Sequence, residues 1–154
     1  MAERLISARE LGLETGLAAG EEGALFKWLV ASLLFGKPIQ QRIAEQAYRV
    51  IVEQQQRDTP RKLGQCSKSE LVRLLGQAHY VRYDFSTAER LLQLCQRLTR
   101  DYDGQVSQIR QQSANREEFE ARLSAFNGIG PKTIEIFMRQ AGAGLFPPSA
   151  VSSP

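Results

Sequence analysis

The residues best suited to chemistry lie near the end of the chain, in the segment Asn127–Thr133, which reads NGIGPKT. Gly128 and Gly130 allow backbone angles that other residues avoid, and they let the main chain approach a ligand closely. Pro131 suits the first position of a helix. The N–H groups of that first turn have no partner within the helix, and their partial positive charge favours phosphate. Because Lys132 adds a full positive charge, the segment predicts a phosphate-binding turn before a helix.

Two predicted helices hold this turn in place. Asn115 and Glu118 match the capping-box pattern that begins a helix, and apolar residues follow at helical spacing to about Phe126. The second helix is predicted from Pro131 to about Gly142. The turn is therefore expected to join two amphipathic helices.

Together the helices and the turn, over residues of about 117–141, match the helix-hairpin-helix pattern of DNA-binding proteins. Such a hairpin contacts the sugar-phosphate backbone, which positions a protein on DNA without reading base sequence. An ordinary helix–helix turn is the alternative, and the well-patterned flanking helices favour DNA binding. We predict that the chain binds double-stranded DNA through these residues: Asn127, Gly128, Ile129, Gly130, Lys132 and Thr133.

The rest of the chain predicts an all-α fold. Apolar residues recur three and four positions apart, and no alternating β pattern of useful length is present. We expect one helical domain over residues 1–145 and a Pro/Ser-rich tail over residues 146–154. Between the hairpin and the N-terminus, the predicted helices are Glu3–Leu17, Glu21–Phe35, Pro38–Gln56, one from Ser67 to Leu75, and one begun by a capping box at Ser86 and Glu89. A polar loop is predicted over Arg57–Gln65 and an aromatic connector over Gly76–Asp84.

Charge is unevenly distributed along the chain. The net charge is +3, and the isoelectric point is about 9.1. Residues 1–24 carry two arginines and five glutamates, a net charge of −3, so the remaining residues carry +6. A basic body is compatible with a polyanionic partner, although a solvated surface of mixed charge explains the same numbers equally well.

Composition argues against several other classes of protein. The chain has two cysteines, Cys66 and Cys95, and one histidine, His79. A zinc or iron–sulfur site needs about four ligands, so we expect neither a metal nor another cofactor. The longest apolar run, Ala24–Gly36, is too short to span a bilayer and contains Lys27. Without a signal-peptide pattern, the expected location is the cytoplasm, with nucleoid association in a prokaryote.

With these residues in view, the chain resembles the helix-hairpin-helix base-excision DNA glycosylase superfamily, in particular endonuclease III-like members. The hairpin Phe126–Arg139 is the specific match. Leu25–Val52 and Tyr83–Leu98 match in pattern and order, so the resemblance covers most of residues 25–140. It implies a compact helical monomer that acts on duplex DNA containing a damaged base or an abasic site. The target base would turn out of the helix into a cleft.

The resemblance also implies roles for individual residues. Lys132 lies where bifunctional members carry the lysine that forms a Schiff base, and a phosphate contact is the alternative role for this residue. Lys37 and Gln41 follow the second predicted helix, where the family presents a polar side chain that fills the gap left by a flipped base. Lys37 is a candidate for that role, and an exposed helix start is the alternative.

The sequence departs from the family at one catalytic position. The family has an aspartate about twenty residues beyond the hairpin, whereas this chain has Ser152 nearest to that place, and the cluster-binding cysteines are missing. Asp84, in the aromatic connector, is the candidate substitute carboxylate, and a local helix cap is its alternative role. Three functions therefore stay open: a DNA glycosylase or abasic-site lyase, a catalytically inactive DNA-binding module, and a helical protein-interaction domain.

Overall fold

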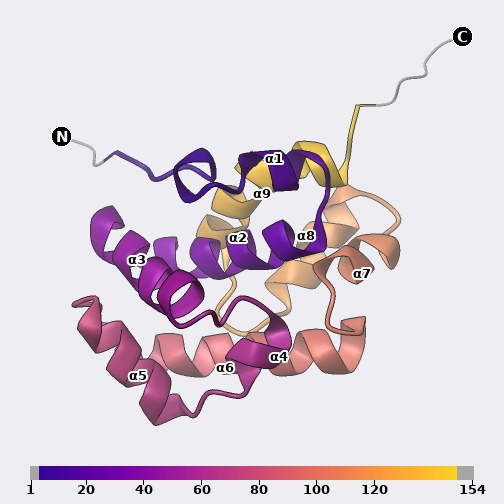
Figure 1. The fold of residues 1–154 in the computed structure, drawn as a ribbon. Coiled ribbons are helices and arrows are strands. Elements are labelled where there is room, and N and C mark those ends of the chain that lie inside the picture. Colours follow the sequence, from indigo (N-terminus) through magenta and orange to yellow (C-terminus); the bar gives the residue numbers. More distant parts are fainter. Residues whose placement is uncertain (1–3, 149–154) are drawn as a thin grey trace, which may run out of the picture.

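The computed structural model describes residues 4–148, and every regular element in this range is a helix (Figure 1). The fold is all-α, as the sequence predicts. No helix in the described range is long and apolar enough to cross a membrane. In chain order the elements are η1 (Arg9–Leu11), α1 (Glu14–Ala18), α2 (Glu22–Phe35), α3 (Gln41–Tyr48), η2 (Arg49–Gln54), α4 (Pro60–Gly64), α5 (Lys68–Gln77), α6 (Asp84–Tyr102), α7 (Val106–Gln111), α8 (Arg116–Ser124) and α9 (Pro131–Leu145).

Helix α2 lies at the centre of the fold. Its residues from Ala24 to Phe35 are buried apart from Lys27, which is half-buried. A helix that is apolar on all sides must be covered on all sides, and α1, α3, α7 and α9 pack around this one. Trp28, in the middle of α2, donates its indole N–H to the Phe137 carbonyl of α9 at 3.2 Å. Helix α2 therefore supports α9, the second helix of the hairpin.

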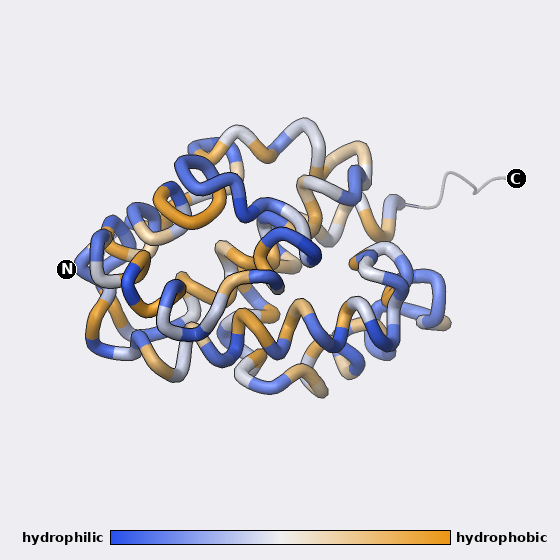
Figure 2. Tube along the Cα trace, turned by 60° about the horizontal axis from the view of Figure 1, so that its bottom comes forward, coloured by the Kyte–Doolittle hydropathy of each residue, from blue (hydrophilic) through white to orange (hydrophobic). Residues whose placement is uncertain are grey.

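Helix α6 organises the other side of the molecule. It packs against α4, α5 and α7, and in Figure 1 it runs along the bottom of the view. Figure 2 shows hydrophobic and hydrophilic positions intermixed along most of the chain, as expected for helices that bury one face and expose the other. The buried apolar residues of the two sides form one continuous cluster.

Local capping signals are confirmed at two predicted helix starts. The Ser67 hydroxyl accepts the Glu70 N–H at 3.0 Å at the start of α5. The Asn115 side chain accepts the Glu118 N–H at 2.9 Å at the start of α8. These caps use residues three positions apart, so the sequence alone specifies them.

Other predicted boundaries are wrong. In the segment predicted as a helix over Glu3–Leu17, the described residues from Arg4 onward form only the short elements η1 and α1. The predicted loop Arg57–Gln65 contains α4, because Thr59 accepts the Lys62 N–H and Pro60 takes the first helical position. The helix predicted over Pro38–Gln56 begins at Gln41 and continues as the π-helical η2.

Two further corrections concern the second half of the chain. The helix predicted from the Ser86–Glu89 capping box begins earlier, at Asp84, so Ser86 lies inside α6 and donates its hydroxyl to the Tyr83 carbonyl. Helix α7, in the Gln/Ser-rich stretch after Gly104, is not among the predicted helices. The Glu22 carboxylate accepts the Val106 and Ser107 N–H groups at the start of α7, a cap from 84 positions away in sequence.

Candidate nucleic-acid interface

The turn between α8 and α9 has the backbone geometry of a tight hairpin. Gly128 has a φ of +88°, in the left-handed region that favours glycine. Gly130 is extended, with Pro131 at the first position of α9. No side chain caps the N-terminus of α9, in contrast to α5 and α8. The first N–H groups of α9 therefore have no side-chain acceptor.

Two apolar side chains anchor this turn in the core. Phe126 and Ile129 are buried, and the Phe126 ring stacks on Tyr102 with ring centroids 5.9 Å apart. Residues Ser124–Gly130 line an open hollow of about 580 Å³ on the outer side of the turn. The main chain between Phe126 and Ile129 is thus fixed to the core by these two side chains and is accessible to a ligand from the solvent.

One face of α6 supports the underside of the turn. The Arg97 guanidinium donates to the Ala125 carbonyl and lies 5.0 Å from the centre of the Phe126 ring. Gln93 accepts a hydrogen bond from the Asn127 side-chain amide at 2.8 Å. The Arg90 side chain passes directly beneath Gly128, since a Cβ placed there would lie 2.6–2.7 Å from its Cγ, Cδ and Nε atoms.

The start of α9 lies against the end of α2. A Cβ added at Gly36 would overlap the Thr133 hydroxyl, so the absence of a side chain at residue 36 allows this approach. Lys37 follows directly, and its ammonium nitrogen lies 5.5 Å from the centre of the Tyr83 ring. This contact joins the α2–α3 connection to the connector between α5 and α6. Three segments distant in sequence therefore meet at the hairpin.

The connector presents both cationic and apolar groups. The Arg82 guanidinium lies 5.4 Å from the Tyr83 ring centre on the same connector. Val81 and Phe85 are 60% and 64% exposed, whereas almost all other large apolar side chains in residues 4–148 are buried or half-buried. Lys68 of α5 lies 5.7 Å from the Phe85 ring centre. An exposed aromatic ring such as Phe85, beside lysine and arginine side chains, is suited to stack on a nucleic-acid base.

The interior of the connector is structural. Tyr80 is buried, and its hydroxyl donates to the Leu34 carbonyl of α2 at 3.3 Å. Burial raises the pKa of Tyr80 to about 12, so its hydroxyl stays protonated. The Asp84 carboxylate accepts the Phe85 N–H at 2.7 Å at the start of α6. The bond joins Asp84 to the next residue in the chain and is not an N-cap bond, because Tyr83 is the N-cap of α6 and no side chain caps this helix.

The structure divides the predicted contact residues into two groups. Asn127, Gly128 and Lys132 are exposed, while Gly130 and Lys37 are half-buried. Ile129, Thr133 and Gln41 are buried. The Ile129 and Thr133 side chains pack inward, so neither is available as a surface contact.

Gln41 in particular faces the interior. It is only 8% exposed, and its side-chain oxygen accepts the Ile6 N–H at 3.2 Å. Gln41 therefore holds the N-terminal segment against α3, and its side chain is not presented as a gap-filling group. Ser152, the residue nearest to the family's aspartate, lies outside the described residues.

Sequence reasoning missed Arg90, Gln93 and Arg97. They lie at positions i, i+3 and i+7 of α6, a spacing that places them on one helix face. The spacing can be seen in the sequence. That this face of α6 packs against the hairpin turn can be seen only in the tertiary structure.

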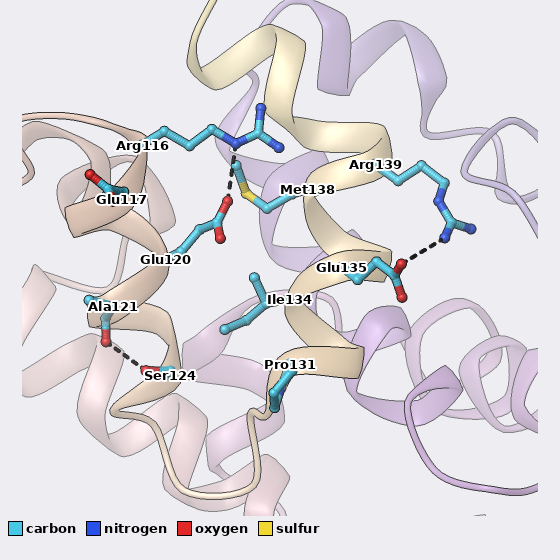
Figure 3. Close-up of a pocket in the computed structure, with 10 residues that line it drawn as sticks. All are labelled: Arg116, Glu117, Glu120, Ala121, Ser124, Pro131, Ile134, Glu135, Met138 and Arg139. Carbon is cyan, nitrogen blue, oxygen red and sulfur yellow. Dashed lines mark hydrogen bonds and ion pairs between the residues drawn. The ribbon is translucent and has the colours of Figure 1, made fainter.

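A groove of about 700 Å³ lies between α8 and α9, beside the hairpin (Figure 3). Ile134 and Met138 point into it, and its sides carry the ion pairs Arg116–Glu120 at 3.0 Å and Glu135–Arg139 at 3.7 Å. Two arginines and three glutamates line it in total, whereas neither Lys132 nor Asp84 does. The charges of this groove do not favour a polyanion, so the turn and the connector form the candidate interface.

Within residues 4–148, no group of three or more His, Cys, Asp or Glu side chains is arranged to hold a metal ion. No protein-family model, no curated protein and no solved structure matches the chain.

Proposed function

We propose that the chain binds double-stranded DNA through the α8–α9 hairpin and acts on damaged DNA as an endonuclease III-like base-excision enzyme. The observation that carries the proposal is the turn itself, with Gly128 in a left-handed conformation and an uncapped helix start beside the exposed Lys132. Unpaired N–H groups at a helix start, next to a cation, favour phosphate. The backbone phosphate of DNA is therefore the proposed ligand of the turn.

The surroundings of the turn support a DNA partner over a small anion. Lys37 lies beside the turn, and Lys68 and Arg82 lie on the connector side of the same region. The exposed Val81 and Phe85 would contact bases once the duplex is opened or distorted. On such a surface the cationic groups would bind the DNA backbone, and the apolar groups would contact a displaced base.

Lys132 is the proposed nucleophile. Its amine would attack the C1′ aldehyde carbon of an open abasic sugar, and loss of water would give an imine. This reaction does not require removal of a base, so it makes fewer demands on a carboxylate than base excision does. The alternative, a catalytically inactive DNA-binding module, is supported by the hydrogen bond that ties the Asp84 carboxylate to the Phe85 N–H and by the missing aspartate after the hairpin.

The test is borohydride trapping on a duplex that contains one abasic site. Borohydride supplies hydride to the imine and converts it into a stable secondary amine, which links protein to DNA. We expect a covalent adduct with the unaltered protein and with Lys37→Ala, and none with Lys132→Ala. An adduct that persists in Lys132→Ala would assign the chemistry to another amine.

Binding to the same duplex is measured in parallel by fluorescence anisotropy at low salt. Binding without an adduct would reject the lyase and leave a DNA-binding module, or at most a glycosylase that forms no Schiff base. Absence of binding at low salt would reject both DNA functions and leave a helical protein-interaction domain.

A further inference from the structure

Arg90 of α6 differs from the other arginines whose Nε atom is buried. Three arginines in residues 4–148 have a buried Nε without a hydrogen-bond partner: Arg57, Arg90 and Arg122. The terminal nitrogens of Arg57 reach the Lys62 carbonyl and Glu70, and Arg122 pairs with Glu118 at 3.2 Å. Arg90 makes no hydrogen bond or ion pair with any described residue. Leaving such a charged donor without an acceptor costs stability.

The position of Arg90 connects its unpaired donors with the hairpin turn. Its side chain passes beneath Gly128, and its Cγ, Cδ and Nε atoms leave no room for a side chain there. Gln93 and Arg97, on the same face of α6, bond to Asn127 and to the Ala125 carbonyl. Arg90 is the member of this row nearest to the connector, and it is the one whose donors remain unused. Its guanidinium group is thus held against the turn with its Nε buried, and its two terminal nitrogens, which bond to no described residue, are the donors left for an external acceptor.

We propose that Arg90 is a phosphate-binding residue. From α6 it would bind the same DNA backbone that the hairpin binds. This inference rests on the proposed function and adds a second element to its binding site. A guanidinium group presents a planar fork that matches two phosphate oxygens. Gly128 then has two roles: it forms the turn, and it lets the arginine come up against the hairpin main chain.

The test separates binding from stability. Arg90→Met removes the charge and keeps a long apolar stem, and Arg90→Lys keeps the charge and removes the fork. Arg9→Met is the matched control, since Arg9 is an exposed arginine of η1 that makes no ion pair with a described residue. Each variant is titrated against a fluorescein-labelled duplex of about 20 base pairs at several NaCl concentrations, and its thermal melting is recorded.

We expect Arg90→Met to weaken binding and to reduce the slope of log Kd against log salt by about one, the effect of one lost phosphate contact. Its melting temperature should be unchanged or raised, because an unsatisfied buried donor is removed. Arg90→Lys should retain the salt slope and bind more weakly than the unaltered protein. Arg9→Met should match the unaltered protein in every measurement.

Two results would overturn the inference. One is a salt slope for Arg90→Met equal to that of the unaltered protein, while that protein binds DNA. The other is a marked drop in melting temperature for Arg90→Met together with unimpaired DNA binding by Arg90→Lys, which would make Arg90 a structural residue. If the unaltered protein itself fails to bind at low salt, the proposed function fails first, and this inference fails with it.

Discussion

Thr133, in the first turn of α9, occupies the space that a side chain at Gly36 would need at the end of α2. Gly36 has an ordinary right-handed backbone, with φ −74°, so an alanine there meets a steric obstacle and no backbone strain. The fit between these two residues fixes how closely the hairpin approaches the central helix.

Gly36→Ala should therefore destabilise the protein by about 1–3 kcal/mol, the usual cost of overpacking. In a Thr133→Ala background the same substitution should cost clearly less, because the overlapping hydroxyl is gone. Urea unfolding of the four proteins of this cycle measures both values. Equal costs in the two backgrounds would show that the contact between these residues is not the cause.

The two glycines of the turn should respond differently to alanine. Gly128→Ala forces a left-handed alanine, at about 1–2 kcal/mol, and also meets the Arg90 side chain. Gly130 is extended, and a Cβ there meets nothing within 4 Å, so Gly130→Ala should change the unfolding free energy by less than about 0.5 kcal/mol. Chemical denaturation compares them, and similar losses for both variants would contradict this geometry.

Phe85 should contribute to binding and not to folding. It is 64% exposed, so Phe85→Ala should leave the melting temperature nearly unchanged. Loss of a stacked aromatic ring costs about 1–3 kcal/mol of binding, so affinity for a duplex with an abasic site should fall at least about fivefold. Leu5→Ala is the control, since Leu5 is also exposed but lies in the N-terminal segment. Equal affinities of the two variants would remove Phe85 from the interface.

The first helix of the hairpin should lose stability in acid through Glu118. The Ala114 N–H donates to this carboxylate, and Arg122 pairs with it, so the pKa of Glu118 is lower than its ordinary value of 4.5. A lowered pKa in the folded state means that the stabilisation is present above pH 4.5 and is lost as pH falls through the folded value.

Glu118→Gln should therefore melt at a lower temperature than the unaltered protein at pH 7, and this difference should shrink as the pH falls below 4.5. Glu117→Gln serves as the control, because Glu117 is exposed in the same helical turn and makes no ion pair with a described residue. A difference between Glu118→Gln and the unaltered protein that is as large at pH 3 as at pH 7 would contradict the prediction.

Cys95 should be inert in the folded protein. Burial raises the pKa of its thiol to about 12, and burial also raises the pKa of Cys66. Because the thiolate is the reactive form, iodoacetamide at pH 8 should leave Cys95 unmodified in the native state and alkylate both cysteines after unfolding in guanidinium. Mass spectrometry distinguishes the products, and rapid native alkylation of Cys95 would show that the thiol is accessible.

Features that depend on near neighbours in the chain could be predicted from the amino-acid sequence. The caps at Ser67 and Asn115 join residues three apart, Pro131 begins α9, and the apolar run of α2 requires a buried helix. In each case the stabilising partner lies within one or two helical turns, or the composition alone forces burial. The all-α fold and the two helices of the hairpin followed from these signals.

Features that depend on distant partners could not be predicted in this way, because they are set by long-range packing. Gln41 looked like an exposed polar residue, but the N–H of Ile6 draws its side chain inward. Arg90 carried no motif, yet the packing of α6 beneath Gly128 places it at the hairpin. Side chains such as these can be placed only when long-range packing determines which helix faces meet, because their burial and their partners are set by residues tens of positions away in sequence.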